Sequence, residues 1–420
     1  MHAYSNLPST LDTVRAQFPS LAVIDDGKPR IYFDNPAGTQ VTAKAVSRMQ
    51  DYLLNATANS AGCFRTSLAT TNLVVEAREK MQAFLNAHSA DEIVFGPNMT
   101  SLTFHLTRAL EPLLSPGDEI LLTRMDHDGN VTPWTLLAER CGLSIKWLEF
   151  NRESCQYNLE QLERLLTPRT RLVAVNHASN ITGTINNVAE IAKHARACGA
   201  LSYVDSVQFA PHGDVDVQDL GCDFLVCSAY KFYGPHVGIL WGKKSVLDAL
   251  SPPKLRAAPD TTPRNFETGC ANYEGLAALI GTVEYYEWLG RQHSPEQDAR
   301  TLINNAKSWM RMHEDALAVR LLQGLSSMPK VRVHGIADEA LIHNRVSTIS
   351  VSVAGHHPLA LATALAEHNI FTWSGHNYAL QVIDSLGLAD SGGVLRLGPV
   401  HYNTAAEVDH VLERLERIIT

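Results

Sequence analysis

A lysine and an aspartate stand at the carboxyl ends of two predicted strands. Lys231 follows the apolar run at residues 223–227 within the segment SAYKFYGP, and Asp205 follows the run at 201–204 within YVDS. A lysine amine forms a Schiff base with an aldehyde, and a carboxylate keeps a pyridine nitrogen protonated so that the ring can accept electrons. Together the two residues predict a site for pyridoxal 5'-phosphate (PLP), with Lys231 on its aldehyde and Asp205 on its ring nitrogen.

Other polar residues follow neighbouring strands and strengthen this prediction. A lone lysine at a strand end is more often a surface residue, and a lone aspartate more often caps a helix. Here the predicted strands are followed in turn by Asp126-His127-Asp128, His177-Ala178-Ser179-Asn180, residues 205–208 and residues 228–231. Because ligands of parallel α/β sheets bind outside the carboxyl ends of the strands, these segments form the predicted site.

The elements that position these residues alternate along the chain. Between residues 92 and 242, short β-rich apolar runs alternate with segments whose apolar residues recur every three or four positions. This pattern predicts βαβ crossovers and a mostly parallel sheet. The predicted strands are 93–95, 119–122, 144–150, 171–176, 201–204, 223–227 and 238–241, and the predicted helices include 100–114, 158–166 and 188–198.

The remainder of the chain predicts a smaller α+β domain. Residues 251–264 (SPPKLRAAPDTTPR) are rich in proline and predict a surface loop or crossover. From about residue 294 the pattern predicts a long helix, strands near Val331, at 347–353 and around Ile370 and Val394, a helix at 358–367 and a final helix from Thr404.

The composition excludes several classes of protein. The 420 residues are 45% hydrophobic and 19% charged, which is typical of a folded chain of two or three domains and not of a disordered one. The net charge of −9 disfavours a nucleic-acid partner. The sequence shows no signal peptide, no membrane span and no C-x-x-C pair among its 7 cysteines, so we expect no membrane association and no metal site. The cytoplasm is the predicted location.

Collinear motifs identify a family. The chain resembles the class V aminotransferase family, and within it the cysteine desulfurases and selenocysteine lyases, with isopenicillin N epimerase-like enzymes as further relatives. The motifs are YFDNPAGTQ from Tyr32, DHDGNVTPW from Asp126, HASNITGT from His177, YVDSVQ from Tyr203, CDFLVCSAYKFYGP from Cys222, FETGCAN from Phe266 and LRLGPVHYNT from Leu395.

The resemblance implies an architecture. It is the PLP-dependent transferase fold type I, with a large domain built on a mostly parallel seven-stranded sheet and a smaller α+β C-terminal domain. The predicted boundaries are 1–30 for an N-terminal segment of the small domain, 31–290 for the large domain and 291–420 for the small domain. The segment FETGCAN matches a loop that reaches into the active site of a second subunit, which implies a homodimer with a shared active site.

The resemblance also implies roles for individual residues around the cofactor. Lys231 is then the Schiff-base lysine and the catalytic base at Cα, and Asp205 pairs with the pyridine nitrogen. His127 stacks on the ring and belongs to the catalytic set, while Gln208 and Asn180 bind near the ring hydroxyl. The implied phosphate-end residues are Ser228, Asn98, Met99 and Cys270, and the implied substrate-binding residues are Arg396 for the α-carboxylate, His376 and Asn35.

One departure from the family pattern affects the expected reaction. Desulfurases of this group carry a catalytic cysteine in a segment of the type R-x-G-H-H-C-A, whereas this chain has Trp373-Ser374-Gly375-His376-Asn377-Tyr378-Ala379. A phenol cannot store a persulfide as a thiolate does. Tyr378 therefore either packs over the cofactor or serves as an acid, and both interpretations stay open. Cys63 and Cys270 are more simply read as unreactive cysteines than as a relocated thiol.

The predicted function is that of a PLP-dependent enzyme acting at Cα or Cβ of a small amino acid or amine through an external aldimine. Lyase chemistry is favoured, with epimerisation and transamination as further outcomes of the same carbanion. One alternative is a cysteine desulfurase or selenocysteine lyase that releases sulfur or selenium with alanine. A second is a PLP-binding protein without turnover, which the presence of Lys231, Asp205 and Arg396 disfavours.

Overall fold

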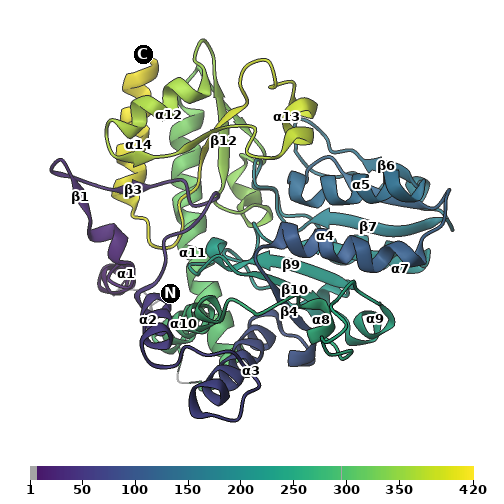
Figure 1. Cartoon of the computed structure of the whole chain (residues 1–420). Helices are drawn as coiled ribbons and strands as arrows, with labels where there is room; N and C mark the ends of the chain where they lie inside the picture. The colour runs from purple at the N-terminus through teal and green to yellow at the C-terminus, as the bar shows by residue number, and fades with distance from the viewer. Residues whose placement is uncertain (1–6, 295) are drawn as a thin grey trace.

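A seven-stranded sheet forms the centre of the large domain in the computed structural model, which describes residues 7–294 and 296–420 (Figure 1). Its strands lie in the order β4-β10-β9-β8-β7-β5-β6. Strand β10 is antiparallel to β4 and β9, and the remaining neighbours pair in parallel. The bounds are β4 Ile93–Gly96, β5 Glu119–Thr123, β6 Ser144–Leu148, β7 Thr170–Asn176, β8 Leu201–Asp205, β9 Phe224–Ser228 and β10 Gly238–Gly242.

The sheet is buried on both faces because helices cover each of them. Alternate strand residues enter different hydrophobic cores: Ile120 and Leu122 pack with α4 and α5, whereas Leu121 packs with α7 and α10. Asn98 starts α4, since its Oδ1 accepts a hydrogen bond from Ser101 N at 2.9 Å. The helices of this part are α1 Leu7–Arg15, α2 Ala43–Asn55, α3 Arg65–Leu85, α4 Met99–Leu110, α5 Thr132–Cys141, α6 Glu160–Leu165, α7 Val188–Ala197, α8 Val217–Leu220, α9 Lys244–Ala249 and α10 Tyr273–Arg291.

The smaller domain packs helices on a four-stranded sheet of order β11-β12-β15-β14. A separate parallel pair joins β3 to β13, so that the N-terminal part of the chain meets the C-terminal part. The strands are β1 Ile24–Asp25, β2 Lys28–Pro29, β3 Ile31–Tyr32, β11 Val331–His334, β12 Ile349–Val353, β13 Ile370–Phe371, β14 Trp373–Gly375 and β15 Val394–Leu397. The helices are α11 Ala299–Ser326, α12 Pro358–Ala366, α13 Leu380–Leu386 and α14 Ala405–Ile419.

This architecture confirms the predicted fold class, a mostly parallel seven-stranded sheet with a smaller C-terminal domain. Each strand predicted in the large domain forms, although β6 ends at Leu148, two residues earlier than expected. The sequence pattern did not name several elements that form: helices α1, α2, α3, α5, α8, α9 and α13 and strands β1, β2, β3 and β14. The predicted boundaries at 30/31 and 290/291 stay predictions. Among the described residues, no helix combines the length and the hydropathy that crossing a membrane requires.

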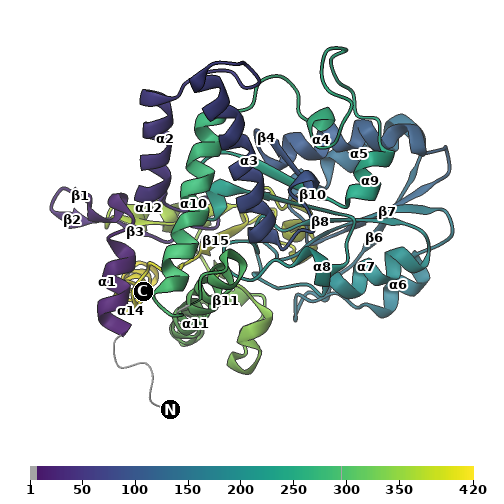
Figure 2. The same ribbon diagram turned by 90° about the horizontal axis from the view of Figure 1, so that it is seen from below.

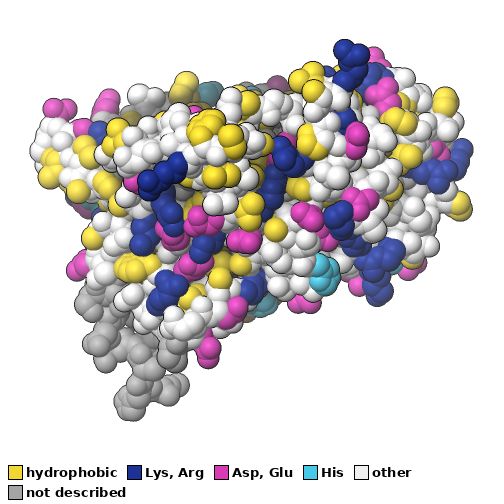
Figure 3. All heavy atoms as spheres, turned by 60° about the horizontal axis from the view of Figure 1, so that its bottom comes forward, with side chains coloured by type: hydrophobic (Ala, Val, Ile, Leu, Met, Phe, Trp, Pro, Cys, Tyr) yellow, Lys and Arg dark blue, Asp and Glu magenta, His cyan; other side chains and the backbone are white. Residues whose placement is uncertain are grey.

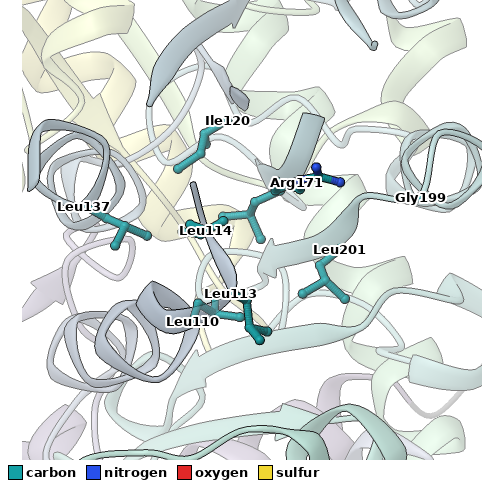
Figure 4. A pocket seen from close by; sticks show the side chains of 9 residues that line it. Leu110, Leu113, Leu114, Ile120, Leu137, Arg171, Gly199 and Leu201 are labelled. Atoms are coloured by element: carbon teal, nitrogen blue, oxygen red, sulfur yellow. The ribbon is translucent and has the colours of Figure 1, made fainter. Parts of the chain in front are cut away.

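An apolar cavity of about 140 Å³ lies at the amino ends of the central strands (Figure 4). The candidate site lies at the opposite, carboxyl ends. Its lining includes Ile120, Leu172 and Leu201, which stand at or near the first residues of β5, β7 and β8. Arg171 lies at this cavity and pairs with Asp118 at 2.9 Å. The cavity is therefore separate from the site described next.

Candidate active site

The carboxyl ends of β8 and β9 bring the two predicted cofactor residues together. Asp205 is the last residue of β8, and Lys231 ends the short helix η5 (Ala229–Lys231) directly after β9. The two strands pair in parallel, with Asp205 opposite Val226. Strands of a parallel pair end at the same edge, so this connection places the amine and the carboxylate at one edge of the sheet.

The amine of Lys231 is held in a partly buried position. Its Nζ donates a hydrogen bond to the carbonyl oxygen of Pro36 and lies 5.3 Å from the centroid of the Tyr230 ring. Burial, together with the positive charge of Arg396, lowers the pKa of Lys231 to about 7, although Asp34 and Asp205 oppose the change. An amine with this pKa is partly unprotonated at neutral pH, as a nucleophile and a proton-transferring base must be.

Asp205 is a buried carboxylate, and few groups of the protein stabilise its negative charge. Its Oδ1 accepts a hydrogen bond from Val207 N at 2.9 Å. Burial raises the pKa of Asp205 to about 6, while the Val207 N–H and Lys231 act in the opposite direction. A protonated pyridine nitrogen would supply a donor and a positive charge to this carboxylate and so favour its ionised form.

Some buried polar atoms of the candidate site have no hydrogen-bond partner among the described residues. Within the described chain, such atoms include Asp34 Oδ1, Asn180 Oδ1, Gln208 Oε1 and Arg396 Nε. Arg396 connects two of these residues, because its Nη1 donates to Asn180 O at 3.2 Å and its Nη2 lies 3.7 Å from Asp34 Oδ1. Unsatisfied buried groups are costly unless a ligand supplies partners. The residues present therefore fit PLP and an amino acid.

Arg396 lies on β15 and is buried, with 3% of its surface exposed. Burial lowers the pKa of Arg396 to about 10, so that the guanidinium is charged at neutral pH. Because Nη1 is occupied by Asn180 O, the edge formed by Nε and Nη2 is the one available to a carboxylate. Asp34, which stands beside this edge, is a site residue that the sequence interpretation missed, although it precedes Asn35 in the first motif.

Asn35 is occupied by the protein itself. Its Nδ2 donates to Tyr32 O at 2.9 Å and to Gly398 O at 2.7 Å, and its Oδ1 accepts a hydrogen bond from the Tyr402 hydroxyl. The side chain is buried and holds the segment that includes Pro36 against the segment that follows Arg396. In this structure Asn35 supports the site and has no free group to offer a substrate.

The predicted phosphate end lies at the start of α4. Met99 N donates to Ser228 Oγ at 3.1 Å, and this bond leaves the hydroxyl hydrogen of Ser228 available to an anion. Asn98 caps the helix and Met99 is buried in its first turn. Cys270 is exposed between η6 (Arg264–Phe266) and α10. A residue that contributes to the active site of a second subunit must be exposed on its own subunit, as Cys270 is.

His127 begins the short helix η4 (Asp128–Asn130) and presents a neutral ring. Its Nδ1 accepts a hydrogen bond from Gly129 N at 2.9 Å, so the proton of the neutral ring is on Nε2. Burial, assisted by the charges of Lys231 and Arg396, lowers the pKa of His127 to about 3. The ring centroid lies 5.7 Å from that of Tyr378. A neutral ring with so low a pKa is better suited to stack on a cofactor than to act as a general base.

The loop that carries Tyr378 is held in an unusual backbone conformation. Asn377 and Tyr378 have φ angles of +50° and +56°, the left-handed region that favours glycine. Their carbonyl oxygens accept hydrogen bonds from Asn180 Nδ2 at 2.9 Å and from Asp128 N at 2.6 Å, respectively. His376 Nδ1 accepts a hydrogen bond from Tyr378 N at 3.0 Å. Both His376 and Tyr378 are exposed, and 66% of the Tyr378 surface is accessible.

Hydrogen bonds and ring contacts of the Tyr378 loop bring several of the predicted site residues together. Asn180 contacts the Tyr378 loop and Arg396, and His127 faces Tyr378. The described residues include no group of three His, Cys, Asp or Glu side chains that could hold a metal ion. Cys63 and Cys270 are exposed, Cys141 and Cys198 are partly buried, and the other three cysteines are buried.

Three cysteines are buried and poorly suited to reaction. Burial raises the pKa of Cys155 to about 11 and the pKa values of Cys222 and Cys227 to about 12. A thiol must ionise to act as a nucleophile, so these three are inert at neutral pH. None of them belongs to the Tyr378 loop, whose residues 373–379 contain no cysteine.

Comparisons with known proteins identify the family of this chain. The family model described as Aminotransferase class-V matches residues 31–411. The chain is 35% identical to the Aminotransferase-like protein FGM3 of Gibberella zeae over 98% of each chain. It is 30% identical to a cysteine desulfurase of Pectobacterium atrosepticum over 97% of this chain and 98% of that one. The solved apo cysteine desulfurase of Thermococcus onnurineus NA1 is 28% identical, with a TM-score of 0.86 and coverage of 97% of this chain and 98% of that chain.

The match over almost the whole chain confirms the resemblance seen in the motifs, and the structural likeness confirms the fold. The cofactor of this family is PLP, and the strand-end residues described above fit it. The chain therefore belongs to the class V aminotransferase family, in its cysteine desulfurase-like part, and is a PLP-dependent enzyme of the transferase or lyase type.

Proposed function

We propose that the enzyme is a lyase that removes the Cα proton of a small amino acid and then expels a substituent from Cβ. When bound, PLP supplies an electron sink for the electron pair left at Cα. The proposal rests on what the chain's own residues can do around that group. The observation that carries it is the Tyr378 phenol, held beside His127 at the position where the resemblance places a catalytic cysteine.

In this proposal Arg396 and Lys231 bind and deprotonate the substrate, and Asp205 and His127 hold the cofactor ring. Arg396 takes the α-carboxylate on its Nε and Nη2 edge and thereby orients the amino acid. Lys231, whose pKa is about 7, would be the base that takes the Cα proton. Asp205 holds a proton on the ring nitrogen by its negative charge. His127 covers the opposite face as a neutral ring.

Tyr378 supports elimination over desulfuration. A desulfurase must accept a sulfur atom on a thiolate, and a phenol cannot do so. A phenol can, however, donate a proton to a departing group. The ring is exposed, while its backbone is fixed by the bond from Asp128 N, so the hydroxyl can reach a substrate that enters from solvent.

The state of His127 disfavours epimerisation. Exchange of the Cα proton between two faces needs a second base opposite Lys231. His127 stands on that side in the proposed arrangement, but its Nδ1 is already an acceptor for Gly129 N and its Nε2 carries the proton. Its pKa of about 3 shows that burial makes it a poor proton acceptor at neutral pH.

The test of the lyase proposal is a product assay with L-cysteine under reducing conditions. Elimination consumes cysteine and water and yields pyruvate, ammonia and sulfide in equal amounts, with no net oxidation or reduction. Desulfuration instead yields alanine, and the sulfur leaves with an external reductant. We expect pyruvate and sulfide in equal amounts from the holoenzyme and none from Lys231→Ala. Alanine as the main product would overturn the proposal, and a panel of amino acids with other Cβ leaving groups identifies the preferred substrate.

We further propose that the enzyme works as a homodimer. Apolar side chains are exposed along α2 and α3, which pack on α10 (Figure 2). They include Leu53, Leu54, Leu68 and Val75. The face of the molecule that contains these helices shows hydrophobic side chains between charged ones (Figure 3). Burial of this surface against a second copy would remove apolar area from water.

The segment 266–272 supports the same proposal. Arg78, which is buried, contacts both carboxylate oxygens of Glu267, at 2.7 and 2.6 Å, and so fixes the start of the segment. Beyond that anchor Cys270 is exposed. Light scattering during size-exclusion chromatography would give the mass: twice the chain mass of 46.1 kDa supports the dimer, and a single mass overturns it.

A further inference from the structure

A chain of buried hydrogen bonds connects the long helix α11 to the cofactor edge of the sheet. Glu314 lies on α11 (Figure 1), and its Oε2 is 2.6 Å from His212 Nδ1. The other ring nitrogen of His212, Nε2, lies 3.5 Å from Gln208 Nε2. Gln208 follows Asp205 by three positions. All three side chains, Glu314, His212 and Gln208, are at least 95% buried.

The donors and acceptors along this chain have a fixed direction. Glu314 accepts at both oxygens, because its Oε1 also accepts a hydrogen bond from His401 N at 3.0 Å. His212 Nδ1 must therefore carry a proton, and in the neutral ring Nε2 presents a lone pair to Gln208. The amide nitrogen of Gln208 faces that lone pair and also donates to Thr348 Oγ1 at 2.9 Å.

The remaining polar atom of this amide, its oxygen, is buried and not engaged by the described part of the protein. With its nitrogen held by His212 and Thr348, Gln208 keeps its Oε1 without a partner in the part of the chain that the structure describes. An amide oxygen can only accept a hydrogen bond. A ring hydroxyl that meets this oxygen is stabilised in its protonated form.

We propose that Glu314 is a positioning residue, which acts through the tautomer of His212 to hold Gln208 with its amide oxygen toward the ring oxygen of PLP. The inference rests on the proposed contact between Gln208 and the ring hydroxyl region, and it is independent of whether the reaction is an elimination. It assigns a role to two buried residues, Glu314 and His212, that lie outside the group described above as the active site.

The Glu314→Gln substitution tests this assignment because it reverses the direction of the hydrogen bonds between residue 314, His212 and Gln208. The side chain keeps almost the same shape. The amide oxygen at position 314 is retained by the fixed N–H donor of His401, so the new NH2 group faces His212 Nδ1. That nitrogen then has to accept, and the ring proton moves to Nε2. Gln208 turns its oxygen to His212 and its nitrogen to the cofactor, where a donor stabilises an ionised ring oxygen.

The readout is the absorbance of the resting holoenzyme at neutral pH, without substrate. Ionisation of the ring oxygen changes the ratio of the visible to the near-ultraviolet band of the bound cofactor. Exchange of one acceptor for one donor should raise that ratio about tenfold in Glu314→Gln. The matched control is Glu287→Gln, since Glu287 is also buried on a helix but pairs with Lys80 at 2.6 Å, and the ratio should stay unchanged.

A second variant distinguishes positioning from a general loss of packing. Gln208→Leu removes the acceptor, so it should also raise the ratio, and Glu314→Gln added to it should have no further effect. A lower ratio in Gln208→Leu would show that the amide nitrogen faces the cofactor and would overturn the proposal. An equal effect of Glu314→Gln with and without Gln208 would overturn it as well. Because no product is measured, failure here is distinct from failure of the lyase assay.

Discussion

Replacement of Arg396 by lysine should remove most of the enzyme's preference for a substrate with a carboxylate. In the guanidinium, Nε has no hydrogen-bond partner among the described residues and Nη2 lies 3.7 Å from Asp34 Oδ1, while Nη1 is engaged by Asn180 O at 3.2 Å. A carboxylate can bind the edge formed by Nε and Nη2 through two parallel bonds. The ammonium of a lysine keeps the charge but lacks the planar fork.

The expected magnitude follows from the bonds lost. Arg396→Lys keeps one charge-assisted hydrogen bond to the carboxylate and loses the other, together with the bond to Asn180 O. A hydrogen bond to a charged group contributes about 2 kcal/mol, which corresponds to about 30-fold in binding. The retained positive charge limits the loss to this value, because the long-range attraction to the carboxylate persists.

A pair of ligands isolates the carboxylate contribution. L-Alanine and ethylamine both bring an amine to the cofactor, but only the first has a carboxylate, and the change in visible absorbance on titration of the holoenzyme gives each dissociation constant. We expect the affinity for L-alanine to fall about 30-fold in Arg396→Lys and that for ethylamine to change by less than about threefold. Arg332→Lys, at an exposed position of β11, is the control. Equal losses for both ligands would refute the assignment.

Three further outcomes test other parts of the structure. In cofactor-free protein, Lys231→Met should raise the melting temperature below pH 7, and this gain should disappear as the pH rises toward 10.5. Between pH 7 and 10.5 the unfolded chain still binds the lysine proton whereas the folded chain does not, so the wild type regains stability there. Tyr378→Phe should lower the turnover number about 100-fold with little change in substrate affinity if the phenol protonates the leaving group; unchanged turnover would leave it a packing residue. Arg78→Ala removes the buried guanidinium that pairs with partly buried Glu267 and leaves this carboxylate only the bond from Phe95 N. It should lower the free energy of unfolding by about 3 kcal/mol, measured in urea, against less than about 1 kcal/mol for Arg140→Ala at an exposed pair.

The central sheet could be predicted from the sequence because its strands are short apolar runs bounded by turn residues. Buried parallel strands such as β7 (TRLVAVN) have little amphipathic alternation, and their length separates them from helices. Once the strands were placed, Lys231 and Asp205 had to lie at their carboxyl ends. The contacts that these two residues make with Pro36 O and Val207 N, and the position of Asp34 beside Arg396, were not predicted.

The loop at 376–378 could not be predicted in the same way. Nothing in the residues Asn377 and Tyr378 requires a left-handed backbone, which in the structure is held by Asp128 N and Asn180 Nδ2. Those donors are about 200 positions or more away in the sequence, so the conformation depends on the completed fold. Local propensity favours glycine at such angles, and tertiary hydrogen bonds override it here.

Two asparagines show what a motif leaves undecided. Asn35 and Asn180 both lie in family motifs, and the sequence interpretation placed both at the ligand. In the structure, Asn35 has each polar atom of its amide engaged by the protein, whereas Asn180 has only its Nδ2 engaged and its buried Oδ1 has no partner among the described residues. Since a buried amide oxygen without a partner costs stability, Asn180 is retained at that expense, which a ligand contact would offset. The hydrogen bonds therefore distinguish an amide that the protein itself satisfies, that of Asn35, from one whose oxygen could still accept a hydrogen bond from a ligand, that of Asn180.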